Sequence, residues 1–241
     1  MDESSKSLPT SHLLGSVPAV ISEEKNASNY EEGFEQQPAN GWKGVFNISS
    51  YIQFFDVDTD IVLNRLMSSF YPSGGDFSHK IDANPDLYGL IWISTTLVFV
   101  LAAFGNCATY LMQKHSDSST SWSFDVSYMN VAAGSVYGYV IVVPLAFYFL
   151  LQYLGTKPSL VRFWCLWGYS LFVFVVSSFL LLIPVELLRW IIIILAGSSS
   201  ACFVALNLRS YIEGSDLSLM VVAAFFLQMA LAIFIKVWFF P

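Results

Sequence analysis

Hydrophobic and polar positions divide the chain at about residue 87. Before this point short apolar groups are mixed with polar and acidic residues, whereas beyond it long apolar runs are separated by short polar links. A transmembrane helix needs about 20 consecutive, mostly apolar residues. Five stretches reach this length and predict spans at about 90–112, 131–154, 163–183, 190–208 and 217–240. The pattern therefore predicts an all-α membrane protein, with a five-helix transmembrane bundle over 88–241 and an N-terminal tail over 1–87.

The links between the predicted spans are short, so neighbouring helices should run antiparallel within one bundle. We expect Pro184 to end the third helix, because proline lacks the amide that would continue it. Pro144 lies in mid-span, where we expect a kink and no boundary, since membrane helices tolerate proline. Small residues four apart, in 197–201 and at Gly134 and Gly138, predict close approach between helices.

The N-terminal tail has two parts. Residues 1–41 are rich in Ser, Glu, Asn, Gln and Pro, and we expect them to be largely disordered because they hold too little apolar surface to order themselves. Residues 42–82 contain more aromatic and aliphatic side chains and are predicted to be partly helical. In the stretch DTDIVLNRLMSSF the apolar residues recur at helical spacing and predict one apolar face: Val62, Leu63, Leu66, Met67 and Phe70.

An amphipathic helix beside a membrane can lie on lipid, dock on the bundle, or bind a protein partner. Lipid binding is the least favoured of the three, because Arg65 is the one base near Asp56, Asp58 and Asp60 and an anionic leaflet would repel the segment. The other two remain open, and the face is a candidate partner-binding surface.

Composition supports a membrane protein with an acidic tail. Charged residues make up 12% of the chain, against about 25% in ordinary soluble domains. The first 87 residues carry 5 Lys and Arg against 13 Asp and Glu, and the remaining 154 carry 6 against 5. The three cysteines, at 107, 165 and 202, lie in apolar runs without disulfide or zinc spacing, and we interpret them as small buried hydrophobes.

Catalytic chemistry has few residues to work with. Ion-coupled transporters keep ionisable groups at mid-depth, whereas the predicted spans offer only Lys236, near the end of the last one, where it can snorkel. Intramembrane hydrolysis needs a nucleophile with a base in reach, but His12, His79 and His115 all lie outside the spans. The sequence therefore predicts a protein that is not an enzyme, with no catalytic, metal or cofactor site and no nucleic-acid partner.

Orientation depends on the short loops and the tail. Lys and Arg are divided four to three between the two faces, which only weakly favours a cytosolic N-terminus. Asn26 and Asn47 begin N-x-Ser sequons that a lumenal tail would expose to glycosylation. We expect both to stay unmodified in a cytosolic tail.

With these stretches laid out, the chain resembles the YIPF family over about residues 42–241. This family comprises multi-span Golgi and endoplasmic-reticulum proteins named for interaction with Ypt/Rab GTPases. The resemblance is carried by YIQFFDVDTDIVLNRLMSSFYP, NPDLYGLIWISTTLVFVLAAFGN and GYSLFVFVVSSFLLLIPVELLRW. The FFDVDT segment is similar to one branch, that of the first and second human members and their plant relatives.

Two family motifs are matched residue by residue. Asp86, Leu87, Tyr88 and Gly89 match the run before the first span, and Gly168 with Tyr169 match the pair in the third. Leu90 and Val176 stand where the family usually has proline. The first motif can be structural, because Asp86 can cap free amides, Tyr88 suits an interface and Gly89 permits a bend. Direct contact of either motif with a partner is the other hypothesis.

The resemblance implies a multi-pass protein of the Golgi membrane, or of the endoplasmic reticulum or trans-Golgi and endosomal membranes, with a cytosolic N-terminus and a lumenal C-terminus. It implies a scaffold in vesicle-mediated transport whose partners are Rab/Ypt GTPases, other YIPF-family proteins and COPII or tether components. The alternative is a membrane-active bundle: a channel, a lipid-moving protein or a membrane-shaping protein.

Overall fold

Hydrophobic helices dominate the computed structural model, which describes residues 54–72, 77–82, 84–116, 121, 123–211 and 217–241. The described part is helical and contains no strand. The expected disorder of residues 1–41 and the two sequons at Asn26 and Asn47 lie outside the described residues. The predicted all-α membrane fold is confirmed.

Five segments are long and apolar enough to cross a membrane, in agreement with the predicted number. They are Gly89–His115, Ser127–Tyr153, Leu160–Leu181, Glu186–Tyr211 and Ser218–Phe239. The helices within them are η1 (Gly89–Ile93, a π-helix), α4 (Ser94–Ser116), α5 (Ser127–Tyr153), α6 (Leu160–Ser170), α7 (Phe172–Leu181), α8 (Glu186–Leu208), η2 (Arg209–Tyr211, a 3-10 helix) and α9 (Leu217–Phe239).

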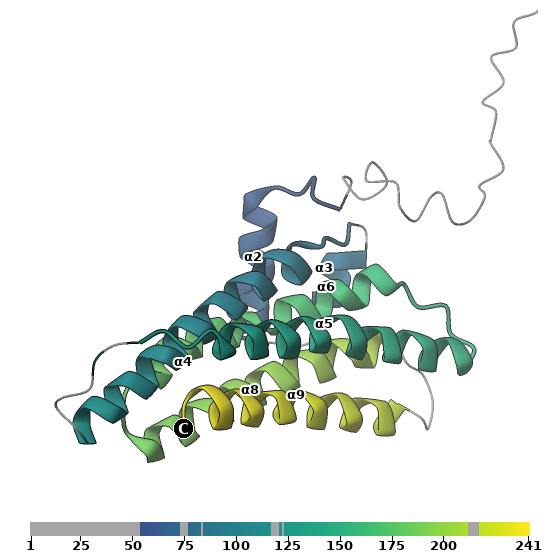
Figure 1. Cartoon of the computed structure of the whole chain (residues 1–241). Helices are drawn as coiled ribbons and strands as arrows, with labels where there is room; N and C mark the ends of the chain where they lie inside the picture. The colour runs from purple at the N-terminus through teal and green to yellow at the C-terminus, as the bar shows by residue number, and fades with distance from the viewer. Residues whose placement is uncertain (1–53, 73–76, 83, 117–120, 122, 212–216) are drawn as a thin grey trace, which may run out of the picture.

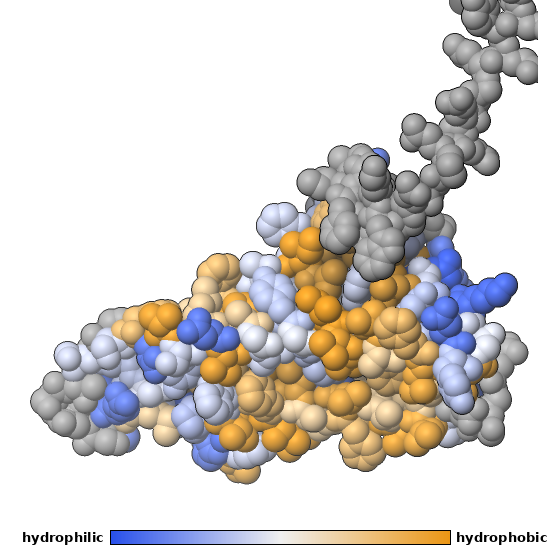
Figure 2. All heavy atoms as spheres, turned by 45° about the vertical axis from the view of Figure 1, so that its right-hand side comes forward, coloured by the Kyte–Doolittle hydropathy of each residue, from blue (hydrophilic) through white to orange (hydrophobic). Residues whose placement is uncertain are grey.

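The long helices lie alongside one another with their ends in two groups (Figure 1). The end of α4, the start of α8 and the C-terminal residue gather at one end of the bundle, and the end of α5 and the start of α6 at the other. On the face seen in Figure 2, hydrophobic residues are gathered mainly over the middle of the described part, and the most hydrophilic residues lie mainly toward its two ends. This distribution is the one expected of a protein whose middle faces hydrocarbon.

Pro144 and Pro184 lie where the sequence predicts, one inside a helix and one at a helix end, and the kink at Pro144 stays a prediction. Pro144 lies inside α5, which continues through it, and Pro184 lies in the turn between α7 and α8. The third span, however, is interrupted at Leu171 although it contains no proline. There the Trp167 carbonyl accepts a hydrogen bond from Ser170 Oγ at 2.6 Å, and the Ser170 carbonyl accepts one from Ser200 Oγ at 2.6 Å. Serine hydroxyls thus bind carbonyls at a point where the helical ladder is broken.

Close helix approach occurs at one of the two predicted places. A Cβ added at Gly197 would lie 2.7 Å from the Cβ of Ala232, so this glycine lets α8 and α9 approach closely. The prediction for Gly134 and Gly138 is wrong, because a Cβ added at either would meet nothing within 4 Å. Both lie on the exposed side of α5, away from its buried stripe, which consists of Ala132, Val136, Val140, Pro144, Phe147 and Leu151.

Two short helices precede the first span: α2 (Thr59–Phe70) and α3 (Phe77–Asp82). The helix expected from the DTDIVLNRLMSSF pattern is therefore present, and α2 stands across the long helices in Figure 1. It packs against α6, α7 and α8. Its predicted apolar face is divided, however: Val62 and Leu66 pack on the core, whereas Leu63, Met67 and Phe70 are exposed. Helix α2 is turned about its own axis relative to the prediction. Its buried face therefore contains Arg65 and Ser69 together with Val62 and Leu66.

Candidate functional site

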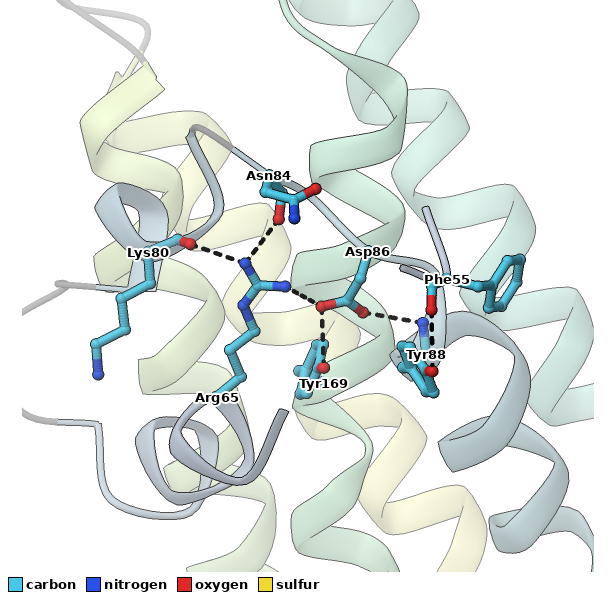
Figure 3. A network of polar contacts seen from close by, with 7 residues as sticks. All are labelled: Phe55, Arg65, Lys80, Asn84, Asp86, Tyr88 and Tyr169. Atoms are coloured by element: carbon cyan, nitrogen blue, oxygen red, sulfur yellow. Dashed lines mark hydrogen bonds and ion pairs between the residues drawn. The ribbon is translucent and has the colours of Figure 1, made fainter. Parts of the chain in front are cut away.

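A buried ion pair joins α2 to the first family motif (Figure 3). Arg65 Nη1 donates a hydrogen bond to Asp86 Oδ2, and the two side chains are only 2% and 0% exposed. Arg65 Nη2 donates to the backbone carbonyls of Lys80 at 2.9 Å and Asn84 at 2.7 Å. One guanidinium therefore holds the segment between α3 and the first span against α2.

The Asp86 carboxylate accepts two further hydrogen bonds. Tyr169 Oη, from the second motif, donates to Oδ2 at 3.1 Å. The backbone amide of Tyr88 donates to Oδ1 at 2.9 Å, which is the capping role expected of Asp86. Removal of a carboxylate from water is costly unless it is paired and hydrogen-bonded, and these donors meet that need. We call the group of Arg65, Asp86 and Tyr169 the clasp.

The two motif glycines allow the segments that carry them to touch. A Cβ added at Gly89 would lie 2.7 Å from the Tyr169 amide nitrogen, and one added at Gly168 would lie 2.4 Å from the Gly89 carbonyl carbon and the Leu90 nitrogen. Real Cβ atoms essentially never come this close to backbone, so both positions require glycine. Gly89 opens the π-helix η1, in which the Gly89 carbonyl accepts a hydrogen bond from Ser94 Oγ at 3.3 Å.

The segment before α2 is fastened to the same place. The Leu87 amide donates to the Phe54 carbonyl at 3.2 Å, and Tyr88 Oη donates to the Phe55 carbonyl at 3.1 Å. The rings of Phe55 and Tyr88 are also in contact, with centroids 5.8 Å apart. The FFDVDT segment, the first motif and the second motif therefore form one continuous contact region.

A second polar cluster lies among the spans, beside the interruption at Leu171. Gln228 of α9 is fully buried; its Nε2 donates to Ser170 Oγ at 3.0 Å and to Ser200 Oγ at 2.6 Å. Tyr139 Oη of α5 donates to Gln228 Oε1 at 2.5 Å. One side chain thus connects α5, α6, α8 and α9, a common way to hold membrane helices together.

The remaining buried charges lie near the end of the bundle that holds the C-terminal residue. Lys236 Nζ, whose stem is buried, donates to the exposed Glu186 carboxylate at 2.5 Å and lies 4.6 Å from the Trp190 ring centroid. The expected snorkelling into water is not seen, because the Lys236 side chain is only 6% exposed and its ammonium is held by Glu186 and the Trp190 ring. Arg189 donates to the carbonyls of Ile183 at 3.0 Å and Pro241 at 2.7 Å. Over the described residues, no group of three or more His, Cys, Asp or Glu could hold a metal ion.

Sequence reasoning identified Asp86, Gly89, Gly168 and Tyr169, and the structure brings all four together. Leu87 is buried beside them and Tyr88 is half-buried. Arg65 was missed as a site residue. The signal available was its position, because an arginine between Val62, Leu66 and Ser69 shares their helix face and needs a buried anion. Contact of the motifs with a partner stays a prediction.

A model of the Yip1 domain matches residues 67–238. The chain belongs to the Yip1-domain, or YIPF, family. The match includes Asp86, Gly168 and Tyr169, whereas Arg65 lies just before it.

Two curated YIPF relatives show how far the similarity extends. The chain is 33% identical over 200 residues to the protein YIPF1 homolog of Dictyostelium discoideum, covering 81% of this chain and 56% of that protein. It is 30% identical over 116 residues to protein YIP5 of Schizosaccharomyces pombe, covering 48% of this chain and 45% of that protein. The chain thus spans about half the length of these relatives. No solved structure matches it.

Proposed function

We propose that this YIPF protein is a non-enzymatic scaffold of Golgi or early secretory membranes that acts in vesicle-mediated transport. In this proposal its cytosolic N-terminal segment binds Rab-type GTPases and COPII or tether components, and its bundle associates with other YIPF proteins. Membership of the family supports a role in membrane traffic.

The clasp is the observation that carries the proposal. Arg65, Asp86 and Tyr169 fasten the start of the first span and α2 to the bundle, so the chain before Phe54 leaves from a fixed place. The buried charges of the described bundle bind protein groups: Arg65 binds Asp86, Lys236 binds Glu186 and Arg189 binds carbonyls. A bundle of this kind is suited to holding position, and in this proposal a soluble partner binds the N-terminal residues ahead of Phe54.

The binding test uses the full chain in lipid nanodiscs and a panel of purified Rab GTPases, each loaded with GDP or a GTP analogue. The matched variant replaces residues 1–41 with an uncharged linker of equal length, which leaves every described residue unchanged. We expect at least one GTPase to bind the native chain in one nucleotide state and to lose binding to the variant. Absence of binding by every GTPase, or equal binding to both chains, would contradict the proposal.

Location and orientation require a separate measurement in cells. Protease protection and glycosylation mapping of the N-terminal segment, with a Golgi marker imaged alongside, should find that segment on the cytosolic side and Asn26 and Asn47 without sugar. Glycosylation of either asparagine would place the segment in the lumen, where no Rab GTPase could reach it.

The interruption at Leu171 beside Gln228 favours the second candidate function, a membrane-active bundle, because transporters build sites at broken helices in mid-membrane. Reconstituted vesicles provide the test. Ion flux or lipid movement that the Gln228→Leu variant loses would support this candidate, and equal behaviour of protein-loaded and empty vesicles would exclude it.

A further inference from the structure

The link between the second and third spans forms a pocket at one end of the bundle. It joins Tyr153, where α5 ends, to Leu160, where α6 begins (Figure 1). Gly155, with a φ of +85°, turns the chain within this link. The pocket has a volume of about 350 Å³ and is lined by six residues of α5 and the link: Tyr148, Gln152, Gly155, Thr156, Lys157 and Pro158. It shares no residue with the clasp.

Most polar side chains of this pocket have no protein partner. Within the described residues, the Lys157 ammonium, the Tyr148 hydroxyl and the Gln152 amide make no hydrogen bond or ion pair. Thr156 differs, because its hydroxyl donates to the Leu151 carbonyl at 2.8 Å. One charged group and two neutral ones are therefore available to a ligand.

The charge of the pocket favours an anion. Lys157 is the one lining side chain that is charged at neutral pH, and residues 154–159 contain no acid. Helix α6 adds to the positive potential, because the side chain of its N-cap, Ser159, makes no hydrogen bond to the amides of the first turn. A ligand with one negative charge suits this balance, whereas a ligand that carries an ammonium group would be repelled by Lys157.

The pocket lies at the level of lipid headgroups. Tyr153 and Leu160 are also the end of the second span and the start of the third, so the link between them stands just outside the hydrocarbon. Tyr148 lies about 8 Å inside this end of the span at about 1.5 Å per residue, which is a usual position for an interfacial tyrosine. A lysine at this level is placed to attract anionic lipid.

We propose that this pocket binds the headgroup of an anionic phospholipid of the phosphatidylinositol type, in which one phosphate carries an uncharged polyol. The Lys157 ammonium binds the phosphate, and the polyol hydroxyls exchange hydrogen bonds with Gln152 and Tyr148. The volume suits a whole headgroup, because small-molecule sites occupy about 300–1,000 Å³. This site is independent of any role in traffic.

Lipid binding by the purified full chain tests the proposal. Native mass spectrometry from detergent micelles measures the apparent Kd for phosphatidylinositol, phosphatidylserine and phosphatidylcholine with identical acyl chains. Lys157→Gln removes the charge of the pocket. Arg209→Gln is the matched control, because Arg209 is an exposed base at the end of α8, at the same end of the bundle but outside the pocket.

We expect phosphatidylinositol to bind more tightly than the other two lipids. Lys157→Gln should weaken its binding by about tenfold or more, because a hydrogen bond to a charged group is lost. Arg209→Gln should change it by no more than about twofold. Tyr148→Phe, which keeps the ring and removes only the hydroxyl, should weaken it by about threefold and tests the site without altering the link.

Three results would overturn the proposal. Equal affinity for phosphatidylinositol and phosphatidylcholine would show that the pocket selects no anion. Equal weakening by Lys157→Gln and Arg209→Gln would show that the charge of this end of the bundle attracts the lipid and that the pocket does not. Tighter binding of phosphatidylserine would exclude selection of a polyol.

Soluble inositol 1-phosphate distinguishes a lipid site from a site for a free phosphate ester. We expect it to compete only weakly with phosphatidylinositol, because it has no acyl chains to hold it at the membrane surface. Competition as strong as that by unlabelled phosphatidylinositol would overturn the assignment to a lipid.

Discussion

Substitution of Arg65 by methionine removes the guanidinium of the clasp and keeps most of the side-chain volume. Asp86 would remain 0% exposed with its hydrogen bonds from Tyr169 and the Tyr88 amide but without a counter-charge. The carbonyls of Lys80 and Asn84 would also lose their donor. The principal loss is therefore a carboxylate left unpaired in the interior.

The expected loss in the free energy of unfolding follows from the burial of the Asp86 carboxylate. Breaking a buried ion pair by removing one partner costs about 3–5 kcal/mol, because the remaining charge is uncompensated. Arg65→Met with Asp86→Asn removes both charges; the asparagine carbonyl can still accept from the Tyr88 amide, and its NH2 group takes the place of the oxygen beside Tyr169 Oη, to which it can donate. The double variant still loses the hydrogen bonds from Arg65 to the Lys80 and Asn84 carbonyls. Leaving such neutral buried groups unpaired costs about 1–3 kcal/mol. The double variant should thus be more stable than Arg65→Met alone.

The free energy of unfolding can be measured by titration with sodium dodecyl sulfate in mixed micelles, for the native chain, both single variants and the double variant. Arg162→Met is the matched control. It removes the same side chain from the pair with Asp82, whose members are 33% and 45% exposed, and such pairs contribute about 0–1 kcal/mol.

A loss of stability in Arg65→Met no larger than that in Arg162→Met would show that the buried pair of Arg65 and Asp86 contributes no more than an exposed one. So would additive effects of Arg65→Met and Asp86→Asn, since residues in direct contact should couple by about 0.5–3 kcal/mol.

Two further substitutions test the packing of the bundle. Gly168→Ala should destabilise the protein by about 3 kcal/mol or more, because its methyl group would lie 2.4 Å from the backbone at Gly89, whereas Gly134→Ala should be close to neutral in the same titration. Equal effects of the two would contradict the contact at Gly168. Gln228→Leu should cost about 1–2 kcal/mol, because it leaves Tyr139 and two serines without their partner; no change would mean that the cluster does not hold the helices.

The spans were predictable from the sequence because hydropathy over about 20 residues reports directly on the cost of backbone and side chains in lipid. Their internal irregularities were not predictable. The third span breaks at Leu171, where Ser170 and Ser200 supply hydroxyls to the carbonyls. A serine in a helix is compatible with either continuity or interruption, and the choice depends on which neighbours tertiary packing supplies.

The sequence also did not show which of the small residues lie where two helices meet. Gly197 and Gly134 look alike in the sequence, since each has a small residue four positions later. Only the rotation of each helix decides which one meets a neighbour, and that rotation is set by the whole buried stripe. Gly197 meets Ala232, whereas Gly134 lies on the exposed side of α5.

Two of the three clasp residues could be predicted from the sequence, and the third could not. The motif residues Asp86 and Tyr169 could be named from family resemblance, but their common partner could not, because Arg65 lies in a segment that the sequence assigns to the tail. An arginine among aspartates is ordinary on a solvated surface. Its importance follows from the packing of α2 against α6, which brings it to Asp86 from 21 positions away in the chain.

We infer that the clasp holds the tip of α2 against the middle of α8. The most direct test is cross-linking of Phe70→Cys to Ser199→Cys in membranes with a short thiol-reactive reagent, in a chain whose native cysteines are replaced. Because Ser199 Oγ lies 3.3 Å from the Phe70 carbonyl oxygen, we expect efficient linkage that Arg65→Met strongly reduces. Absence of linkage with Arg65 in place would show that α2 does not lie against α8, and equal linkage after its removal would show that the clasp does not hold it there.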